Sequence, residues 1–299
     1  MSINRDPFPE SPIQHVSING ARLAYRTKGD PSGPLMITLH GGRGFGTHES
    51  DFKAYNKLGD SVQLVSFDFR GHGQSSPTPP YTFDQIVQDI ESVRQHFIEQ
   101  GDGSEKKRKF ILEGGSFGGM IAQQYAITFA ENVDNLILRG TAPSWHHEEE
   151  ALQNLISRAP SKAPMATSEM LSKVFGAFTD DNEMRLIFFA IAPLWVDSGY
   201  NPNEGLEVAR RTVYNSESHN QLYSDREKYF DFRPNLKLVT AKTLIIVGQG
   251  DWTCPPSQSE EIHRGIPDSR LVVFEGAGHF VQHEKNREVL EVVRDFLGI

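Results

Sequence analysis

The chain has 299 residues, of which 37% are hydrophobic and 23% are charged. This composition predicts a packed globular protein rather than a disordered one. The formal net charge of −9 argues against non-specific binding to nucleic acid, which needs clustered lysine and arginine to neutralise phosphates. Cys254 is the single cysteine, so no disulfide can form within the chain.

The sequence also argues against a membrane protein. It contains no apolar run that approaches the roughly 20 residues needed to span a bilayer. The polar segment Met1–Pro12 lacks the basic and apolar regions of a signal peptide. We therefore expect a cytoplasmic protein that contacts neither membrane nor nucleic acid, and the oligomeric state is left open.

Short apolar runs bounded by glycine and polar residues recur along the chain. Such runs are typical of strands that are buried on both faces, as in a parallel sheet. Four of them lie in the first half of the chain, at residues 35–39, 62–67, 110–112 and 136–138. Two more follow much later, at residues 244–247 and 271–274.

Helical patterns lie between these runs. Thr82 and Gln85 form a capping box that predicts a helix start. One apolar face then follows at helical spacing, made of Ile86, Ile90, Val93 and Phe97. Residues 120–129 and 289–296 predict two further helices. The alternation predicts an α/β fold with a mainly parallel central sheet flanked by helices.

The pattern changes after the fourth apolar run. Residues 143–235 lack strand-like runs, are punctuated by proline and are predicted to be mostly helical. We therefore expect an α/β core made of residues 1–142 and 236–299, with residues 143–235 inserted as a helical cap, or lid.

The pentapeptide Gly114-Gly115-Ser116-Phe117-Gly118 matches the pattern G-x-S-x-G. It follows a predicted strand and precedes a predicted helix, which is the context of a nucleophile elbow. Small neighbours permit the sharp turn, and the positive end of the helix favours developing negative charge. This context favours Ser116 as a nucleophile over an incidental serine in a glycine-rich turn.

A second glycine-rich segment, His40-Gly41-Gly42-Arg43-Gly44, follows the first apolar run. Its backbone N–H groups can approach an oxyanion. We expect one oxyanion donor from Gly41 or Gly42 and the other from the N–H of Phe117. His40 is expected to brace this loop rather than to transfer protons.

Two further loops carry the candidate partners of Ser116. Asp251 follows the strand-like run that ends at Val247, and His279 follows the last run between glycines. The order Ser, Asp, His fits an α/β-hydrolase triad, with His279 as base and Asp251 as the carboxylate that holds it. His283 is the less favoured histidine, and Cys254 is expected to be a packed small residue.

The loop Asp68–Ser75 follows the second apolar run. Its glycines and charged residues predict a tight turn that is held by hydrogen bonds. We interpret it as scaffold rather than as part of the catalytic machinery.

Together these motifs resemble the α/β-hydrolase superfamily and, more narrowly, its proline iminopeptidase (prolyl aminopeptidase) group. The shared features are HGGRG, DFRGHGQS, GGSFGG, GQGDWTCPP and GAGHF, in that order, with a helical insertion before the fourth. The resemblance covers nearly the whole core and is more specific for fold and triad than for substrate. It implies release of an N-terminal residue, preferably proline, through an acyl-enzyme on Ser116. It implies no metal or organic cofactor.

The sequence departs from that group at two places. Arg43 stands where the group usually has proline, which adds a charge near the entrance and frees an N–H. The group's tryptophan-rich lid stretch with an amine-binding glutamate has no clear match, and residues 194–197 (LWVD) come nearest. Candidate amine ligands in the insertion are Glu148, Glu149, Glu150, Glu204, Glu207 and Glu217. The run of three glutamates is more typical of a solvated helix start.

Three alternatives to an aminopeptidase remain at this stage. An esterase or lactonase for a small acyl substrate would use the same triad, and an apolar pocket without carboxylates would favour it. A non-hydrolytic cyclase or lyase could use the pocket and His279 without an acyl-enzyme. A catalytically inactive binding protein is disfavoured, because Ser116, Asp251 and His279 are all chemically competent.

Overall fold

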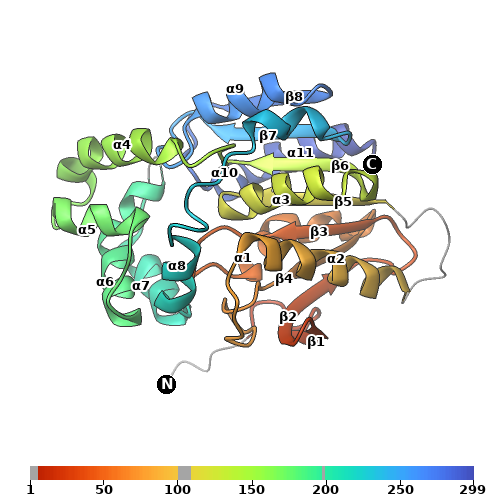
Figure 1. The fold of residues 1–299 in the computed structure, drawn as a ribbon, viewed down its shortest axis with the longest axis horizontal. Coiled ribbons are helices and arrows are strands. Elements are labelled where there is room, and N and C mark those ends of the chain that lie inside the picture. The colour runs from red at the N-terminus through yellow and green to blue at the C-terminus, as the bar shows by residue number, and fades with distance from the viewer. Residues whose placement is uncertain (1–5, 100–108, 197–198) are drawn as a thin grey trace.

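A twisted eight-stranded sheet forms the centre of the molecule (Figure 1). The computed structural model describes residues 6–99, 109–196 and 199–299. The strand order is β1-β2-β4-β3-β5-β6-β7-β8. Strands β1 and β2 run antiparallel to their neighbours, and the remaining pairs are parallel. The predicted α/β architecture with a mainly parallel sheet is confirmed.

Each of the six predicted apolar runs lies in a strand. The strands are β1 Gln14–Ile18, β2 Ala21–Lys28, β3 Leu35–Leu39, β4 Gln63–Phe67, β5 Phe110–Gly115, β6 Val133–Arg139, β7 Lys242–Gly248 and β8 Ser269–Phe274. The sequence analysis missed β1 and β2, which form a hairpin closed by Asn19 and Gly20. Both turn residues have positive φ, 48° and 80°. An Asn-Gly pair between strands is the typical signal for such a turn.

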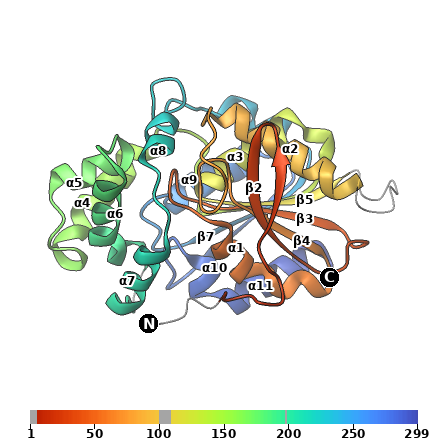
Figure 2. The ribbon, with the colours of Figure 1, turned by 90° about the horizontal axis from the view of Figure 1, so that it is seen from below.

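Helices cover both faces of the sheet (Figure 2). Helices α1 and α11 pack on one face and share one apolar cluster, whereas α2, α3 and α9 pack on the other and share a second. Their bounds are α1 His48–Tyr55, α2 Phe83–Glu99, α3 Phe117–Thr128, α9 Pro256–Gly265, α10 Val281–Glu284 and α11 Asn286–Leu297. Short 3₁₀ turns are η1 Asn56–Asp60, η3 Ala130–Asn132, η4 Lys173–Phe175, η5 Ala192–Trp195 and η6 Arg233–Leu238.

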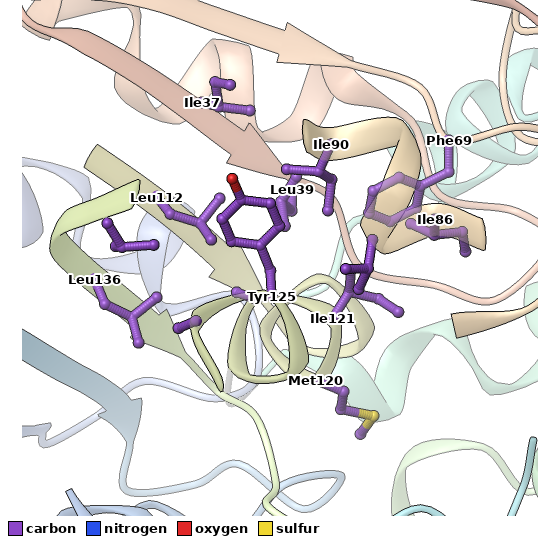
Figure 3. Packing of buried hydrophobic residues seen from close by; sticks show 14 of the residues in the cluster. Ile37, Leu39, Phe69, Ile86, Ile90, Leu112, Met120, Ile121, Tyr125 and Leu136 are labelled. Carbon is purple, nitrogen blue, oxygen red and sulfur yellow. The ribbon is translucent and has the colours of Figure 1, made fainter. Parts of the chain in front are cut away.

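The predicted apolar face of α2 is buried against the sheet and α3 (Figure 3). The N–H of Gln85 donates to Thr82 Oγ1 at 3.2 Å, as the capping box predicts. The Gln85 side chain instead donates to Asp89 at 3.0 Å, so only half of the capping box forms. The four face residues are at most 3% exposed: Ile86, Ile90, Val93 and Phe97. This packing fixes α3, and therefore the turn that precedes it.

In the described part of the segment between β6 and β7, five α-helices lie to one side of the sheet (Figure 1). They are α4 His147–Lys162, α5 Ser168–Ser172, α6 Asp181–Ile191, α7 Pro202–Arg211 and α8 Ser216–Leu222. Helices α4, α5 and α6 share an apolar cluster with the segments next to them, and Trp252 and Phe45 also pack into it. The division into a core and a cap at residues 143–235 stays a prediction. Among the described residues, no helix is long and apolar enough to cross a membrane.

The loop Asp68–Ser75 is held as the sequence predicts. Asp68 accepts from the N–H groups of His48 and Gln74, at 2.6 and 2.7 Å. Arg70 forms a bidentate ion pair with Asp89 of α2, at 2.6 and 2.8 Å, and both side chains are at most 2% exposed. Asn19 of the hairpin turn also donates to Asp89, at 3.0 Å. One carboxylate therefore joins the hairpin, the loop and α2.

We predict that Asp89→Ala lowers the free energy of unfolding by about 3–5 kcal/mol, because it leaves the buried guanidinium of Arg70 without its carboxylate partner. Urea denaturation measures this value. The matched control is Glu207→Ala, which removes an ion pair with Arg210 whose side chains are 55% and 64% exposed. That change should cost less than about 1 kcal/mol. Equal losses in the two variants would contradict the prediction.

Candidate active site

Ser116 lies in a strained turn between β5 and α3. Its φ and ψ are 53° and −121°, a backbone conformation that residues other than glycine rarely adopt. The turn forms because its neighbours are glycines: a Cβ on Gly118 would collide with the carbonyl oxygen of Leu39. The Ser116 carbonyl accepts from the N–H groups of Gly119 and Met120, which begins the helix. The side chain is thereby lifted above the carboxyl edge of the sheet.

His279 and Asp251 lie together after β8 and β7. Nδ1 of His279 is 2.8 Å from Oδ2 of Asp251, and both residues are buried. Oδ1 of the same carboxylate accepts from the N–H groups of Thr253 and Cys254, at 2.9 and 3.0 Å. With a proton on Nδ1, a neutral imidazole carries its lone pair on Nε2. The arrangement can accept a proton at Nε2.

Ser116 and His279 line the same cavity, which has a volume of about 280 Å³. The cavity lies between the loops at the carboxyl edge of the sheet and the inserted helices. Aromatic residues form much of its wall: Phe45, Phe117, Phe175, Phe188, Trp195, Tyr223 and Phe280. A mostly apolar cleft with a few polar groups is the usual form of a small-molecule site.

The glycine-rich loop after β3 lies against Ser116. A Cβ on Gly41 would be 3.0 Å from the Cβ of Ser116, so glycine permits this close approach. His40 Nδ1 is 2.9 Å from the Gly41 carbonyl oxygen, and His40 Nε2 accepts from the N–H of Phe69 at 3.1 Å. Because C=O and N–H point in opposite directions across a trans peptide, the first contact also orients the N–H of Gly42. His40 therefore braces the loop, as predicted.

The N–H of Phe117 belongs to the first turn of α3. Such N–H groups have no carbonyl acceptor within their own helix. The cavity is lined by all four of the residues Ser116, Phe117, Gly41 and Gly42.

Buried histidines surround the site in the neutral form. Burial lowers the pKa of His40 to about 3 and that of His147 to about 4. Burial likewise lowers the pKa of His72, whose Nε2 accepts from the N–H of Gly44 at 2.7 Å. Burial also lowers the pKa of His219 to about 3 and that of His283 to about 4. His283 is 2.9 Å from the Ser50 hydroxyl.

Charged residues that the sequence analysis missed lie beside Gly115, the residue before Ser116, where an added Cβ would collide with the guanidinium of Arg139. Arg139 donates to Asp51 at 2.6 Å and to Glu113 at 3.2 Å, and Tyr55 donates to Glu113 at 3.2 Å. Burial raises the pKa of Glu113 to about 8, against the opposing charge of Arg139. The signal in the sequence is Glu113 itself, a carboxylate inside an apolar strand, just before the glycines of the turn.

Cys254 also lines the cavity, although its side chain is fully buried. Burial raises the pKa of its thiol well above the usual value, which disfavours the reactive thiolate. The expected packed, unreactive cysteine is therefore the better description.

Two expectations about charge near the site were wrong. Glu148 is not solvated but 7% exposed, because it lies on the inward side of α4 beside Lys228, at 3.4 Å. The other five candidate glutamates are exposed: Glu149, Glu150, Glu204, Glu207 and Glu217. Arg43 is not at the entrance but buried in the cavity wall. Of residues 194–197, Trp195 lines the cavity, and Asp197 lies outside the described residues.

Helix α8 contacts the glycine-rich loop directly. The N–H of Asn215 donates to the Gly44 carbonyl at 2.7 Å. The two ring nitrogens of His219 face the carbonyl oxygens of Arg43 and Gly176, at 3.0 and 3.1 Å. The inserted helices therefore support the loop that faces Ser116.

We predict that acid destabilises the protein between about pH 6.5 and pH 4. In this range the unfolded chain binds protons at histidines that stay neutral in the folded protein, so the free energy of unfolding falls as the pH falls. His147→Gln should reduce this slope, because the pKa of His147 is lowered to about 4. The control His263→Gln changes an exposed residue and should leave the slope as it is. Urea denaturation at several pH values would refute the prediction if the His147 variant kept the full slope.

Comparisons with known proteins identify the family and the fold. Residues 34–286 match the family model described as alpha/beta hydrolase fold. The chain is 52% identical to proline iminopeptidase PfmaB from Pestalotiopsis fici, over 95% of this chain and 99% of that protein. It is 27% identical to a proline iminopeptidase from Xylella fastidiosa strain Temecula1, over 97% and 99% of the two chains.

Solved structures show the same fold at lower identity. An α/β fold family hydrolase from Bacillus anthracis superposes with a TM-score of 0.74 at 20% identity, covering 96% of this chain and 99% of that one. Fold, motif order and relatives all agree, and the chain therefore belongs to the α/β-hydrolase fold family, within its proline iminopeptidase-like group.

Proposed function

We propose that the protein is a serine hydrolase in which Ser116, His279 and Asp251 form a catalytic triad. The observation that carries this proposal is a serine in a strained strand-to-helix turn that shares a cavity with His279, whose Nδ1 is bound to a buried carboxylate. Ser116 Oγ attacks the substrate carbonyl carbon, and its proton passes to Nε2 of His279. The same proton then passes to the leaving atom as its bond to the carbonyl carbon breaks, and an acyl-enzyme remains. Water, activated by His279, hydrolyses it.

The oxyanion of each tetrahedral intermediate would be bound by the N–H of Phe117 and the N–H of Gly42. His40 supports the second assignment, because its contact with the Gly41 carbonyl fixes the orientation of that peptide. The first turn of α3 adds the positive end of a helix dipole. Gly41 serves by permitting the close approach to Ser116.

The proposed substrate is a peptide with N-terminal proline or a small residue. The names of the relatives support it, including the one that is 52% identical over 95% of this chain. Such a substrate carries a positive amine, which needs an acceptor. Of the six candidate glutamates in the insertion, Glu148 is the buried one, and its Oε1 has no hydrogen-bond partner. Burial raises its pKa, which Arg43 and Lys228 oppose.

The charge of the cavity favours a second candidate, hydrolysis of a small ester or lactone. Among the described lining residues the one carboxylate is Asp51, and it is already paired with Arg139 at 2.6 Å. Arg43 adds a positive charge to the wall. A wall of this kind suits an uncharged or anionic acyl group better than an ammonium group.

We predict that Ser116→Ala lowers kcat by about 10⁴-fold or more and leaves the melting temperature within a few degrees of the parent. His279→Ala should have nearly the same effect, because members of a triad act as a unit. Asp251→Asn should lower kcat by about 10⁴-fold, because the amide cannot hold the same tautomer of His279. Full turnover in Asp251→Asn would assign the role to another carboxylate. Activity that survives in Ser116→Ala would instead favour a non-hydrolytic cyclase or lyase.

The substrate is decided by comparing four compounds: the arylamides of proline, alanine and N-acetylproline, and a short-chain aryl ester. We expect turnover of free prolyl arylamide and loss of it on N-acetylation, because acetylation removes the positive amine. Glu148→Gln should then raise KM for the prolyl compound more than for the ester. Turnover of the ester alone, lost in Ser116→Ala, would support the second candidate and exclude the peptidase.

A further inference from the structure

Arg43 is a buried cation in the wall of the active-site cavity. Its residue is 4% exposed, and it follows Gly41 and Gly42 in the loop that faces Ser116. The guanidinium stacks on Tyr223 of the segment after α8, with its carbon 4.0 Å from the ring centroid. It also lies 5.4 Å from the ring centroid of Phe117, the residue next to the nucleophile. Arg43 and Ser116 therefore line the same cavity.

Most of the hydrogen-bonding capacity of Arg43 is unused. A guanidinium has five N–H donors. Nη1 donates to the Leu222 carbonyl at 3.1 Å, and Nη2 donates to the weak acceptor Sδ of Met120 at 3.6 Å. Within the described part of the chain, no carboxylate lies within 4.0 Å of the group. Phe83 and Phe230 also lie 5.5 and 5.7 Å from the guanidinium carbon, so aromatic rings surround the group. Buried charges are normally paired with an opposite charge, and among the described residues no carboxylate bonds to this one.

The carboxylates near Arg43 are engaged elsewhere. Asp51 is paired with Arg139, and Asp251 with His279. Glu148 pairs with Lys228 at 3.4 Å. The charge of Arg43 also acts on Glu148, but the two side chains form no direct bond.

The neighbouring histidines leave Arg43 as the charged group here, because an imidazole is neutral or cationic and never anionic. His147 and His219 stay neutral near pH 7, because burial lowers the pKa of both. The part of the cavity around Arg43 is therefore electropositive.

We propose that Arg43 is a specificity residue that pairs with a carboxylate of the substrate, so that this enzyme prefers substrates that carry a negative charge. The proposal rests on the proposed acyl transfer by Ser116 and names the chemical class of the substrate. The carboxylate can belong to the acyl part or to the leaving part, as the free C-terminus of a dipeptide does. A carboxylate in either part would pair with Arg43 in the same way, and separate experiments distinguish the acyl part from the leaving part.

The acyl part is tested with two rigid methyl esters of equal shape, monomethyl terephthalate and methyl 4-carbamoylbenzoate. The first is anionic and the second neutral, and the para carboxylate cannot reach its own ester. We expect kcat/KM to be about tenfold or more higher for the anionic ester, as for a charge-assisted hydrogen bond in a buried site. The leaving part is tested in the same way with prolyl-glycine and prolyl-glycinamide. A preference in either pair supports the proposal and identifies the source.

Variants separate recognition from packing. Arg43→Met keeps an unbranched side chain among the aromatic rings but removes the charge, and it should bring the anionic-to-neutral ratio close to one. Arg43→Lys should keep part of the preference. The matched control is Lys228→Met, which removes the other cation beside Glu148. Lys228 does not line the cavity, so this change should leave the anionic-to-neutral ratio of kcat/KM unchanged. A purely structural role of Arg43 would lower kcat/KM for both members of a pair equally.

Binding gives a readout that does not need turnover. Titration calorimetry of Ser116→Ala with the two esters should show tighter binding of monomethyl terephthalate, and the double variant with Arg43→Met should lose the difference. The role of Arg43 would be overturned if kcat/KM were equal within both pairs and the two esters bound with equal Kd. A preference that persists in Arg43→Met would overturn it too. Absent turnover, or turnover that survives in Ser116→Ala, would overturn the proposed hydrolysis instead, so the two failures are distinguishable.

Discussion

The close approach of three backbone segments at the carboxyl edge of β3 and β5 is the constraint on which the candidate site depends. Gly118 lies against the end of β3, and Gly41 lies against Ser116. A Cβ on Gly118 would collide with the Leu39 carbonyl, and one on Gly41 would press on the Cβ of Ser116, whose φ is 53°. The parallel sheet supplies this geometry, because β3 and β5 are neighbours that end at the same edge. The loops that carry Asp251 and His279 leave the same edge farther along.

Buried polar side chains fix the loops and the helix that surround these backbone segments. Asp89 joins the hairpin, the loop Asp68–Ser75 and α2, while neutral histidines such as His40 and His72 hold the glycine-rich loop through backbone contacts. Each buried polar group that finds a partner restricts the conformations available to its loop. Arg139 does the same beside Gly115. The wall of the cavity is thus mostly apolar, whereas the loops that form it are held by buried polar side chains.

The sequence predicts the parts of this molecule that are determined locally. Apolar runs locate six strands, and glycine patterns locate the loops of Ser116, Asp251 and His279, because strands and tight turns impose their own residue preferences. The hairpin of β1 and β2 was missed, although its Asn-Gly turn was visible. The burial of Glu148 and the position of Arg43 could not be predicted, because they depend on how the inserted helices pack against the core. Three-dimensional contacts between distant segments decide whether a charge is solvated or enclosed.

The contacts of α8 with the glycine-rich loop have a consequence for how such proteins diversify. Asn215 and His219 bind the carbonyls of Gly44 and Arg43, so the inserted segment and the backbone beside the nucleophile form one mechanical unit. Exchanging the inserted helices with those of a relative would withdraw these two supports from the loop. A change in this segment that alters the cavity can therefore also shift the loop beside Ser116, and a transplanted segment would need to restore both contacts.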